Sequence, residues 1–379
     1  MKYQSLTSFS KKLDSSYEKY RVEGFPKRHF EPGQFHEIID GVVGTTIRRV
    51  TVREAGKSFE GRSIRLFSAG RGKTNVLLWS QMHGDESTAT MAITDILNYL
   101  FVTAGEKATA KILSALTVHF LPILNPDGAS RCVRRTAQGI DMNRDALALQ
   151  TPEGKILRQL QKQFRPRFGF NLHDQELSTV GASRSITAIG LLAPAFDERR
   201  KDNAVRTRAK CLASVFAHAI TPAAKGSIAR YDDTFEPRAF GDNMQKWGTS
   251  TLLVESGHAS GDPEKQRIRK LNFTGILTCL YAIATGGYTR ARIADYEGLP
   301  FNGKKAYETI IRKILVDDGG GRMRKTDLAL SSQVDTHLEP PAKLVDAGDL
   351  STFVGLEEID GKGKVITRDK LRFGEPFEM

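Results

Sequence analysis

Apolar and polar positions alternate along this chain with two different periods. Five runs rich in apolar and β-branched residues have the length of β-strands and cover 62–68, 74–80, 116–124, 168–173 and 250–255. Between them, apolar positions recur at helical spacing over 87–101, 152–164, 197–219 and 264–285. Strands that alternate with helices predict an α/β fold with a doubly wound, mixed and largely parallel sheet.

The two ends of the chain have a different pattern. Residues 5–20 predict a short helix, and residues 24–34 predict a loop that contains Gly and Pro. Beyond about residue 300, the short apolar runs 308–316 and 353–360 are followed by glycine-rich turns. This predicts a small C-terminal β domain.

Charge and composition limit the partners that we expect. The 379 residues include 56 Lys and Arg against 44 Asp and Glu, which gives a net charge of +12. The basic residues are spread over several predicted helices and are mixed with apolar positions. Because the sequence has no arginine-rich tail, zinc finger or RNA-binding motif, we expect solvated helix faces and no nucleic-acid partner.

Cysteine use and hydropathy bear on the compartment. Cys132, Cys211 and Cys279 are far apart and follow no metal-ligand spacing, which indicates reduced and mostly buried thiols. No stretch approaches the roughly 20 apolar residues of a membrane helix. The segment that begins at Met1 has no apolar run of signal-peptide length, so we expect a cytoplasmic protein with no leader and no membrane partner.

Residues suited to metal binding stand where two predicted strands end. The strand at 74–80 leads into His83-Gly84-Asp85-Glu86, and the strand at 168–173 ends at His173. A catalytic zinc takes imidazole nitrogen and carboxylate oxygen from three protein ligands and keeps one position open. His83 and Glu86 can converge on one metal if the backbone turns sharply, which Gly84 permits. Each motif alone also fits an ordinary loop histidine, but together they favour a metal site at the carboxyl edge of the sheet.

A polar stretch at 125–146 follows another predicted strand. A solvated surface loop would be equally polar, but arginine side chains also bind carboxylates and developing oxyanions through paired hydrogen bonds. The stretch therefore suits anion recognition. Its charged and amide residues include Asn125, Asp127, Arg131, Arg134, Arg135, Asp141, Asn143, Arg144 and Asp145.

Glu255 closes the apolar strand at 250–255. A carboxylate in such a position is costly unless it is hydrogen-bonded or functional. Beside a zinc ion it could take a proton from water and pass it to a leaving amine. A purely structural carboxylate is the alternative.

Five motifs together resemble the zinc carboxypeptidase (peptidase M14) family over about residues 45–290. In order they read HGDE, NPDG, RRTAQGIDMNR, NLHD and LLVESG. The resemblance implies a mixed eight-stranded α/β/α sandwich. It also implies that His83, Glu86 and His173 are the metal ligands and that Glu255 is the general base.

The same resemblance implies roles for other polar residues. Arg134 falls on the arginine that stabilises the oxyanion, with adjacent Arg135 as the alternative. Asp141 falls on the aspartate that orients a metal-bound histidine. The implied substrate contacts are Asn143 and Arg144, which would hold a terminal carboxylate, and Tyr231, the nearest candidate for the family's mobile tyrosine.

These inferences combine into one expected organisation and activity. We expect a zinc-dependent metallocarboxypeptidase domain over 41–300, an N-terminal extension over 1–40 and a β-rich accessory domain over 301–379. The expected reaction is hydrolysis of the amide bond next to a free carboxylate of a peptide. Two alternatives stay open. One is an aspartoacylase-like or succinylglutamate-desuccinylase-like zinc amidohydrolase that acts on an acylated amino acid, and the other is a non-catalytic binding module.

Overall fold

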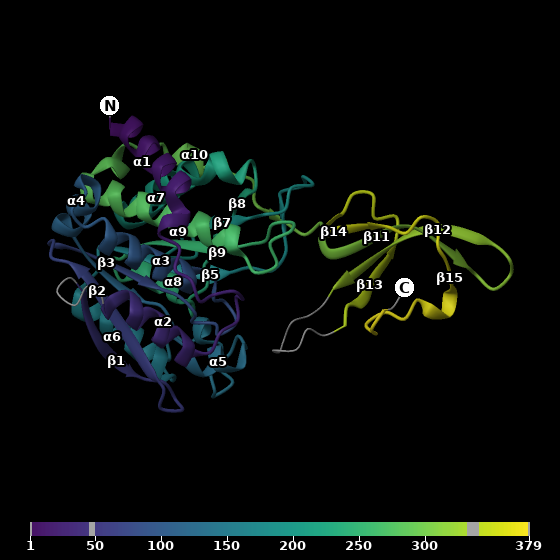
Figure 1. Ribbon diagram of the computed structural model, residues 1–379, viewed down its shortest axis with the longest axis horizontal. Helices are drawn as coiled ribbons and strands as arrows, with labels where there is room; N and C mark the ends of the chain where they lie inside the picture. The colour runs from purple at the N-terminus through teal and green to yellow at the C-terminus, as the bar shows by residue number, and fades with distance from the viewer. Residues whose placement is uncertain (1, 45–49, 332–340, 378–379) are drawn as a thin grey trace.

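The computed structural model describes residues 2–44, 50–331 and 341–377. The chain up to about residue 300 is built around one eight-stranded sheet with helices on both faces. The last strands form a second sheet that lies to one side, at the right of Figure 1.

The main sheet is mixed, and its central strands are parallel. The strand order is β1-β2-β4-β3-β5-β9-β7-β8. The pairs β4–β3, β3–β5, β5–β9 and β7–β8 are parallel, whereas β1–β2, β2–β4 and β9–β7 are antiparallel. The strands are β1 (Val50–Lys57), β2 (Ser63–Gly70), β3 (Thr74–Trp79), β4 (Leu116–Leu121), β5 (Phe168–Asp174), β7 (Ile189–Leu192), β8 (Ile228–Arg230) and β9 (Ser250–Ser256). The predicted fold class is confirmed, although the sequence analysis did not predict β1, β7 or β8.

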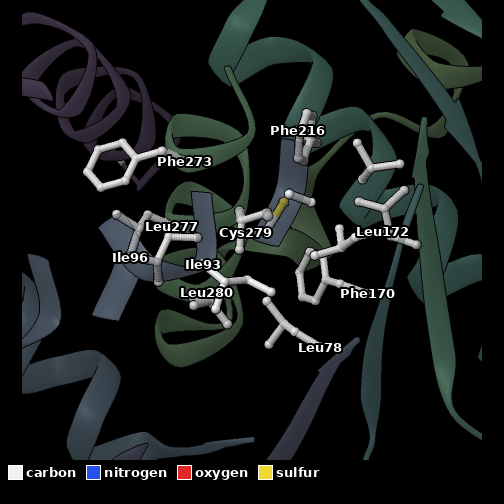
Figure 2. Close-up of a cluster of buried hydrophobic side chains, with 14 of the residues drawn as sticks. Leu78, Ile93, Ile96, Phe170, Leu172, Phe216, Phe273, Leu277, Cys279 and Leu280 are labelled. Atoms are coloured by element: carbon white, nitrogen blue, oxygen red, sulfur yellow. The ribbon is translucent and has the colours of Figure 1, made fainter. Parts of the chain in front are cut away.

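Continuous apolar runs form the central strands because both faces of the sheet are covered. Along β3, Val76 and Leu78 point into one core, and Leu77 and Trp79 point into the other. The larger core lies between the sheet and helices that include α3 and α9 (Figure 2). The smaller core lies under α6 and α8.

Helices α1, α3, α6 and α9 agree with the predicted pattern, whereas α2, α4, α5, α8 and α10 were not predicted and α7 begins later than expected. Asn203 accepts hydrogen bonds from the N–H groups of Val205 and Arg206, so the helix begins after it and not near 197. The helices are α1 (Lys2–Ser16), α2 (Pro32–Gly44), α3 (Thr88–Val102), α4 (Lys107–Ala115), α5 (Pro126–Arg131), α6 (Pro152–Phe164), α7 (Ala204–Ala224), α8 (Phe240–Lys246), α9 (Gln266–Thr285) and α10 (Ile293–Glu297). No helix in the described ranges is long and apolar enough to cross a membrane.

The N-terminal helices pack into the main body. Leu6, Leu13 and Tyr17 belong to the larger core, and α2 spans the expected boundary at residue 40. The Tyr17 hydroxyl donates to the buried carboxylate of Asp95, 2.8 Å away. This segment therefore shares the core of the α/β body.

The C-terminal sheet has a core of its own. Its order is β13-β12-β11-β14, with β15 paired to β11. Ile314, Leu328 and Leu344 are fully buried between its strands. The strands are β11 (Ala306–Asp317), β12 (Met323–Ser331), β13 (Lys343–Gly348), β14 (Val354–Asp360) and β15 (Val365–Thr367). The division at residues 40 and 300 stays a proposal.

Short contacts join this sheet to the main body. The small strands β6 (Thr179–Val180) and β10 (Asn302–Gly303) pair antiparallel just before β11 begins. Arg184 donates to the Ser351 carbonyl and pairs with Glu358, and Ser260 donates to the Leu356 carbonyl. The second sheet therefore lies against loops at the carboxyl edge of the first.

Candidate functional site

His83, Glu86 and His173 meet at the carboxyl ends of β3 and β5. One ligand atom from each lies within 4.8 Å of the others, and among the described residues this is the one group of three such side chains. His83 Nδ1 is 2.7 Å from Glu86 Oε1, and His173 Nδ1 is 2.7 Å from Glu86 Oε2. All three side chains are buried. The structure thus brings together the three residues that the sequence analysis selected as metal ligands.

Gly84 is needed in this loop for a reason that the sequence analysis did not foresee. The left-handed conformation after β3 occurs at Gln81, with φ of 45°, and not at Gly84. A Cβ atom on Gly84 would lie only 2.0 Å from the backbone carbon of Gly128. The glycine is required because the HGDE loop and helix α5 approach so closely.

Asp141 and Arg134 contact the same group from the polar stretch. Asp141 Oδ1 lies 3.1 Å from His83 Nε2. Arg134 donates to Asp141 Oδ2 through Nε and Nη2, and its Nη1 reaches both His83 Nδ1 at 3.1 Å and Glu86 Oε1 at 3.3 Å. Asp141 therefore links an arginine to a histidine through one carboxylate.

The charges in this cluster stabilise one another. Burial opposes a charge on His83, but the carboxylates of Glu86 and Asp141 outweigh it and raise the pKa of His83 to about 9. Burial lowers the pKa of His173, against the raising effect of Glu86. Burial also acts against ionised Glu86, yet the two imidazoles hold the pKa of this carboxyl far below its usual range. The group therefore keeps an ionised carboxylate in a buried place, which suits a cation.

Glu255 lies on β9 directly opposite His173 on β5. Within the described part of the chain, no donor lies within hydrogen-bond distance of its carboxylate. Burial, together with the negative charge of Glu86, raises the pKa of Glu255 to about 8. On its other side, Gly190 leaves room, since a Cβ there would lie 3.2 Å from the Glu255 Cβ.

The NPDG residues mainly make internal contacts. Asn125 caps α5 by accepting from the Gly128 N–H, and buried Asp127 accepts from Ser58 Oγ and the Glu60 N–H. Asp145 likewise accepts from the N–H groups of residues 150 and 151. The composition of the stretch had suggested anion recognition, but these three acceptors are already used to hold the loop.

Asn143 and Arg144 sit in a short 3-10 turn beside the cluster. The Asn143 N–H donates to Asp141 Oδ1, and Asn143 Oδ1 accepts from the Phe240 N–H. The Arg144 guanidinium is partly exposed, and its Nε lies 3.5 Å from Glu236 Oε2. Glu236 is a neighbour that the sequence analysis missed, because it comes from a distant loop.

The remaining predicted substrate contacts differ in position. Arg135 is exposed, and its Nη1 donates to the Gly139 carbonyl and not to the His–Glu–His group. Tyr231 follows β8 with a partly exposed side chain. Burial, and then the negative charges of Glu255 and Glu176, raise the pKa of Tyr231. The tyrosine therefore lies within the electrostatic reach of Glu255.

A buried ion pair beside His173 was also missed. Lys265 is 1% exposed, and its ammonium donates to Asp174 Oδ2 at 3.1 Å and to the Ser256 carbonyl at 3.2 Å. It thereby joins the residues that follow His173 and Glu255. No motif in the sequence marks this lysine, since it lies ten residues beyond Glu255 in a loop.

The donor set fits a zinc ion. Two imidazole nitrogens and a carboxylate are the usual ligands of a catalytic zinc. Because Asp141 accepts at His83 Nε2, one ring hydrogen is held there, so Nδ1 can give up its proton and offer its lone pair to a cation beside Glu86. The fold and this site define a class of protein. It is an α/β sandwich in which two histidines and a glutamate, a set of side chains suited to metal binding, meet at the ends of parallel strands.

Comparison with known proteins agrees with this class. The model of the zinc carboxypeptidase family, peptidase M14, matches residues 35–182. A probable carboxypeptidase 2 of Trichophyton verrucosum is 30% identical over 115 residues, which is 30% of this chain and 22% of that protein. The chain thus matches less than a quarter of the length of this curated relative. On these matches residues 35–182 are similar to the zinc carboxypeptidase family.

Solved structures share the fold. A metallo-carboxypeptidase from Burkholderia cenocepacia superposes with a TM-score of 0.53 at 17% identity, over 68% of this chain and 70% of that one. Carboxypeptidase A from Helicoverpa armigera gives a TM-score of 0.53 at 17% identity, over 73% and 80% of the two chains. At such identity the likeness concerns the fold alone.

Proposed function

We propose that this chain is a zinc-dependent metallocarboxypeptidase that hydrolyses the amide bond next to a free C-terminal carboxylate. The observation that carries the proposal is the convergence of His83, Glu86 and His173, with Glu255 in register beside His173. Zinc, when bound, supplies a Lewis acid that polarises a carbonyl and makes water more acidic.

Glu255 is the proposed general base. Its carboxylate takes a proton from the attacking water and later delivers that proton to the leaving amine. The burial that raises the pKa of Glu255 to about 8 supports this role, because it makes the carboxylate a stronger base than a solvated one.

Arg134 is the proposed stabiliser of the oxyanion. Its Nε and Nη2 are anchored on Asp141, and because the guanidinium is planar these two contacts also fix the position of Nη1. Nη1 is directed towards His83 Nδ1 and Glu86 Oε1, so it lies beside the proposed metal ligands. A donor held there, next to the reacting carbonyl, would stabilise the negative oxygen.

Asn143 and Arg144 are proposed to hold the terminal carboxylate of the substrate. Arg144 Nη1 donates to the Asn143 carbonyl at 2.8 Å and its Nε has only a long contact to Glu236 at 3.5 Å, so the guanidinium has further N–H groups that can donate to a carboxylate. Tyr231, which lies within the electrostatic reach of Glu255, is proposed as a further substrate contact. Arg135 is a weaker candidate because its guanidinium is directed to Gly139.

The deciding experiment compares substrates on the zinc-loaded protein. A peptide with a free C-terminal carboxylate should be shortened by one residue, whereas the same peptide with a C-terminal amide should not. An acylated amino acid such as N-acetylaspartate tests the alternative amidohydrolase function. Equal cleavage of the free and amidated peptides, or hydrolysis of the acylated amino acid alone, would overturn the carboxypeptidase proposal.

A further inference from the structure

A cavity lies where the C-terminal sheet meets the main body. Its volume is about 410 Å³, which is within the range of small-molecule sites. Its walls come from α9, from the end of α7, from the loop after Glu255 and from the start of β14. The cavity is separate from the His–Glu–His group, since none of those three residues lines it.

The lining combines an apolar floor with basic groups. Ile186, Ile268 and Leu271 contribute apolar surface. Arg184, Lys270 and Arg267 contribute positive charge, and Asp14 is the acid in the lining. An occupant with an apolar body and a negative group would match both parts.

The positive charge that the lining leaves unpaired for such an occupant is close to one unit. Arg184 is paired with Glu358 at 3.1 Å, and Lys270 is paired with Asp14 at 3.0 Å. Arg267 is exposed and forms no ion pair with any residue in the described ranges. One unpaired guanidinium favours a monoanion over a phosphate with two charges.

His258 adds a polar group to the cavity wall. Its Nδ1 is buried and makes no hydrogen bond within the described residues. The backbone N–H of His258 donates to the Thr187 carbonyl at 3.0 Å, which holds this residue in place beside the cavity. Burial, and then the positive charges of Lys265 and Arg28, lower the pKa of His258 to about 2, so the ring is neutral. The ring therefore adds no charge to the cavity wall.

We propose that this cavity binds a small organic monocarboxylate with an apolar body. The carboxylate pairs with Arg267, while the apolar body lies against Ile268 and Leu271. The bound molecule would touch both α9 and β14, and so would join the main body to the C-terminal sheet. This inference does not depend on the proposed peptidase activity.

The test is a calorimetric titration of the protein with 4-phenylbutyrate. It is done with the wild type and with Arg144→Ala, which removes the proposed carboxylate contact of the other site. We expect one molecule to bind Arg144→Ala, and the neutral 4-phenylbutyramide to bind at least tenfold more weakly. Failure of the carboxylate to bind, or equal binding of the amide, would overturn the proposal.

Two variants locate the binding site. Arg267→Gln, made in the Arg144→Ala protein, should weaken binding at least tenfold, whereas the exposed Arg199→Gln should leave it unchanged. Ala223 is an exposed residue of the cavity lining. Ala223→Trp puts a large side chain at the cavity and should abolish binding of the acid. If Arg267→Gln and Ala223→Trp both bind like their parent, the carboxylate binds elsewhere and the assignment is wrong.

Discussion

His173 and Glu255 are direct partners in the parallel pair of β5 and β9. Residues that pair in register on neighbouring strands point to the same face of a sheet. A histidine that contacts Glu86 therefore has a buried carboxylate beside it, although the two residues are 82 positions apart in the sequence.

The first prediction concerns the metal. Replacing His83 by Ala removes one of the two imidazole donors and leaves Glu86 with a single histidine partner. We expect marked loss of zinc from the purified protein, measured by elemental analysis. His36→Ala is the control, because His36 lies outside this group. An unchanged zinc content in the His83 variant would exclude the proposed ligand set.

The second prediction concerns the proposed base. Glu255→Gln keeps the shape of the side chain but cannot take a proton, so kcat should fall on the order of 10²–10⁴-fold. Zinc content and melting temperature should stay close to those of the wild type. Glu176→Gln changes a nearby carboxylate and serves as the matched control. Normal kcat in the Glu255 variant would show that this carboxylate is structural.

The third prediction concerns recognition of the substrate end. A charge-assisted hydrogen bond contributes about 1.5–3 kcal/mol, so Arg144→Ala should raise KM roughly 10- to 100-fold for peptides with a free C-terminus. Arg135→Ala should change KM far less, because its guanidinium is directed to the Gly139 carbonyl. Steady-state kinetics on both variants separates the two arginines, and a larger effect at Arg135 would reverse the assignment.

The fourth prediction concerns the buried ion pair that anchors the N-terminal segment. Arg269 donates to both oxygens of Asp95, which also accepts from Tyr17 and from the Val22 N–H. Arg269→Met leaves the buried carboxylate without its charge partner, so the free energy of unfolding should fall by about 3–5 kcal/mol. Denaturant unfolding measures this loss. Arg290→Met, at an exposed position, should change stability by less than about 0.5 kcal/mol.

The fifth prediction concerns stability and pH. Burial, and then the charge of Arg53, lower the pKa of His119 to about 4, against about 6.5 in the unfolded chain. Between these values the unfolded chain binds a proton that the folded chain does not. The contribution of His119 to the free energy of unfolding is therefore fully present above about pH 6.5, and it is lost as the pH falls towards 4.

Comparison with a variant isolates this contribution. His119→Gln should show a shallower loss of unfolding free energy between pH 6.5 and 4, by up to about 1.4 kcal/mol per pH unit. Gln can still form hydrogen bonds with Ser68 and Asn75, the present partners of the ring. Identical pH dependence in the two proteins would contradict the prediction.

The sequence by itself determined the α/β class and selected His83, Glu86 and His173. It could do so because these features are local: a wholly apolar run such as that of β3 marks a strand covered on both faces. His83 and Glu86 follow one such run, and His173 lies at the end of another. The start of α6 was also predictable, since Thr151 accepts from the Gly154 N–H as a helix cap does. The five motifs also follow one another along the chain in the order that resembles the zinc carboxypeptidase family, which strengthens these local signals.

Only the tertiary structure decided which polar residues are free to act. Arg134 and Arg135 are neighbours with the same chemistry, yet one reaches Glu86 and the other the Gly139 carbonyl. Lys265 and Glu236 have no recognisable motif, because their partners come from distant segments. The short strands β7 and β8 were missed because the pairing of β7 with β9 and of β8 with β7, and not a long apolar pattern, defines them. Contacts between remote parts of the chain depend on how the backbone is folded, and residue type alone does not specify them.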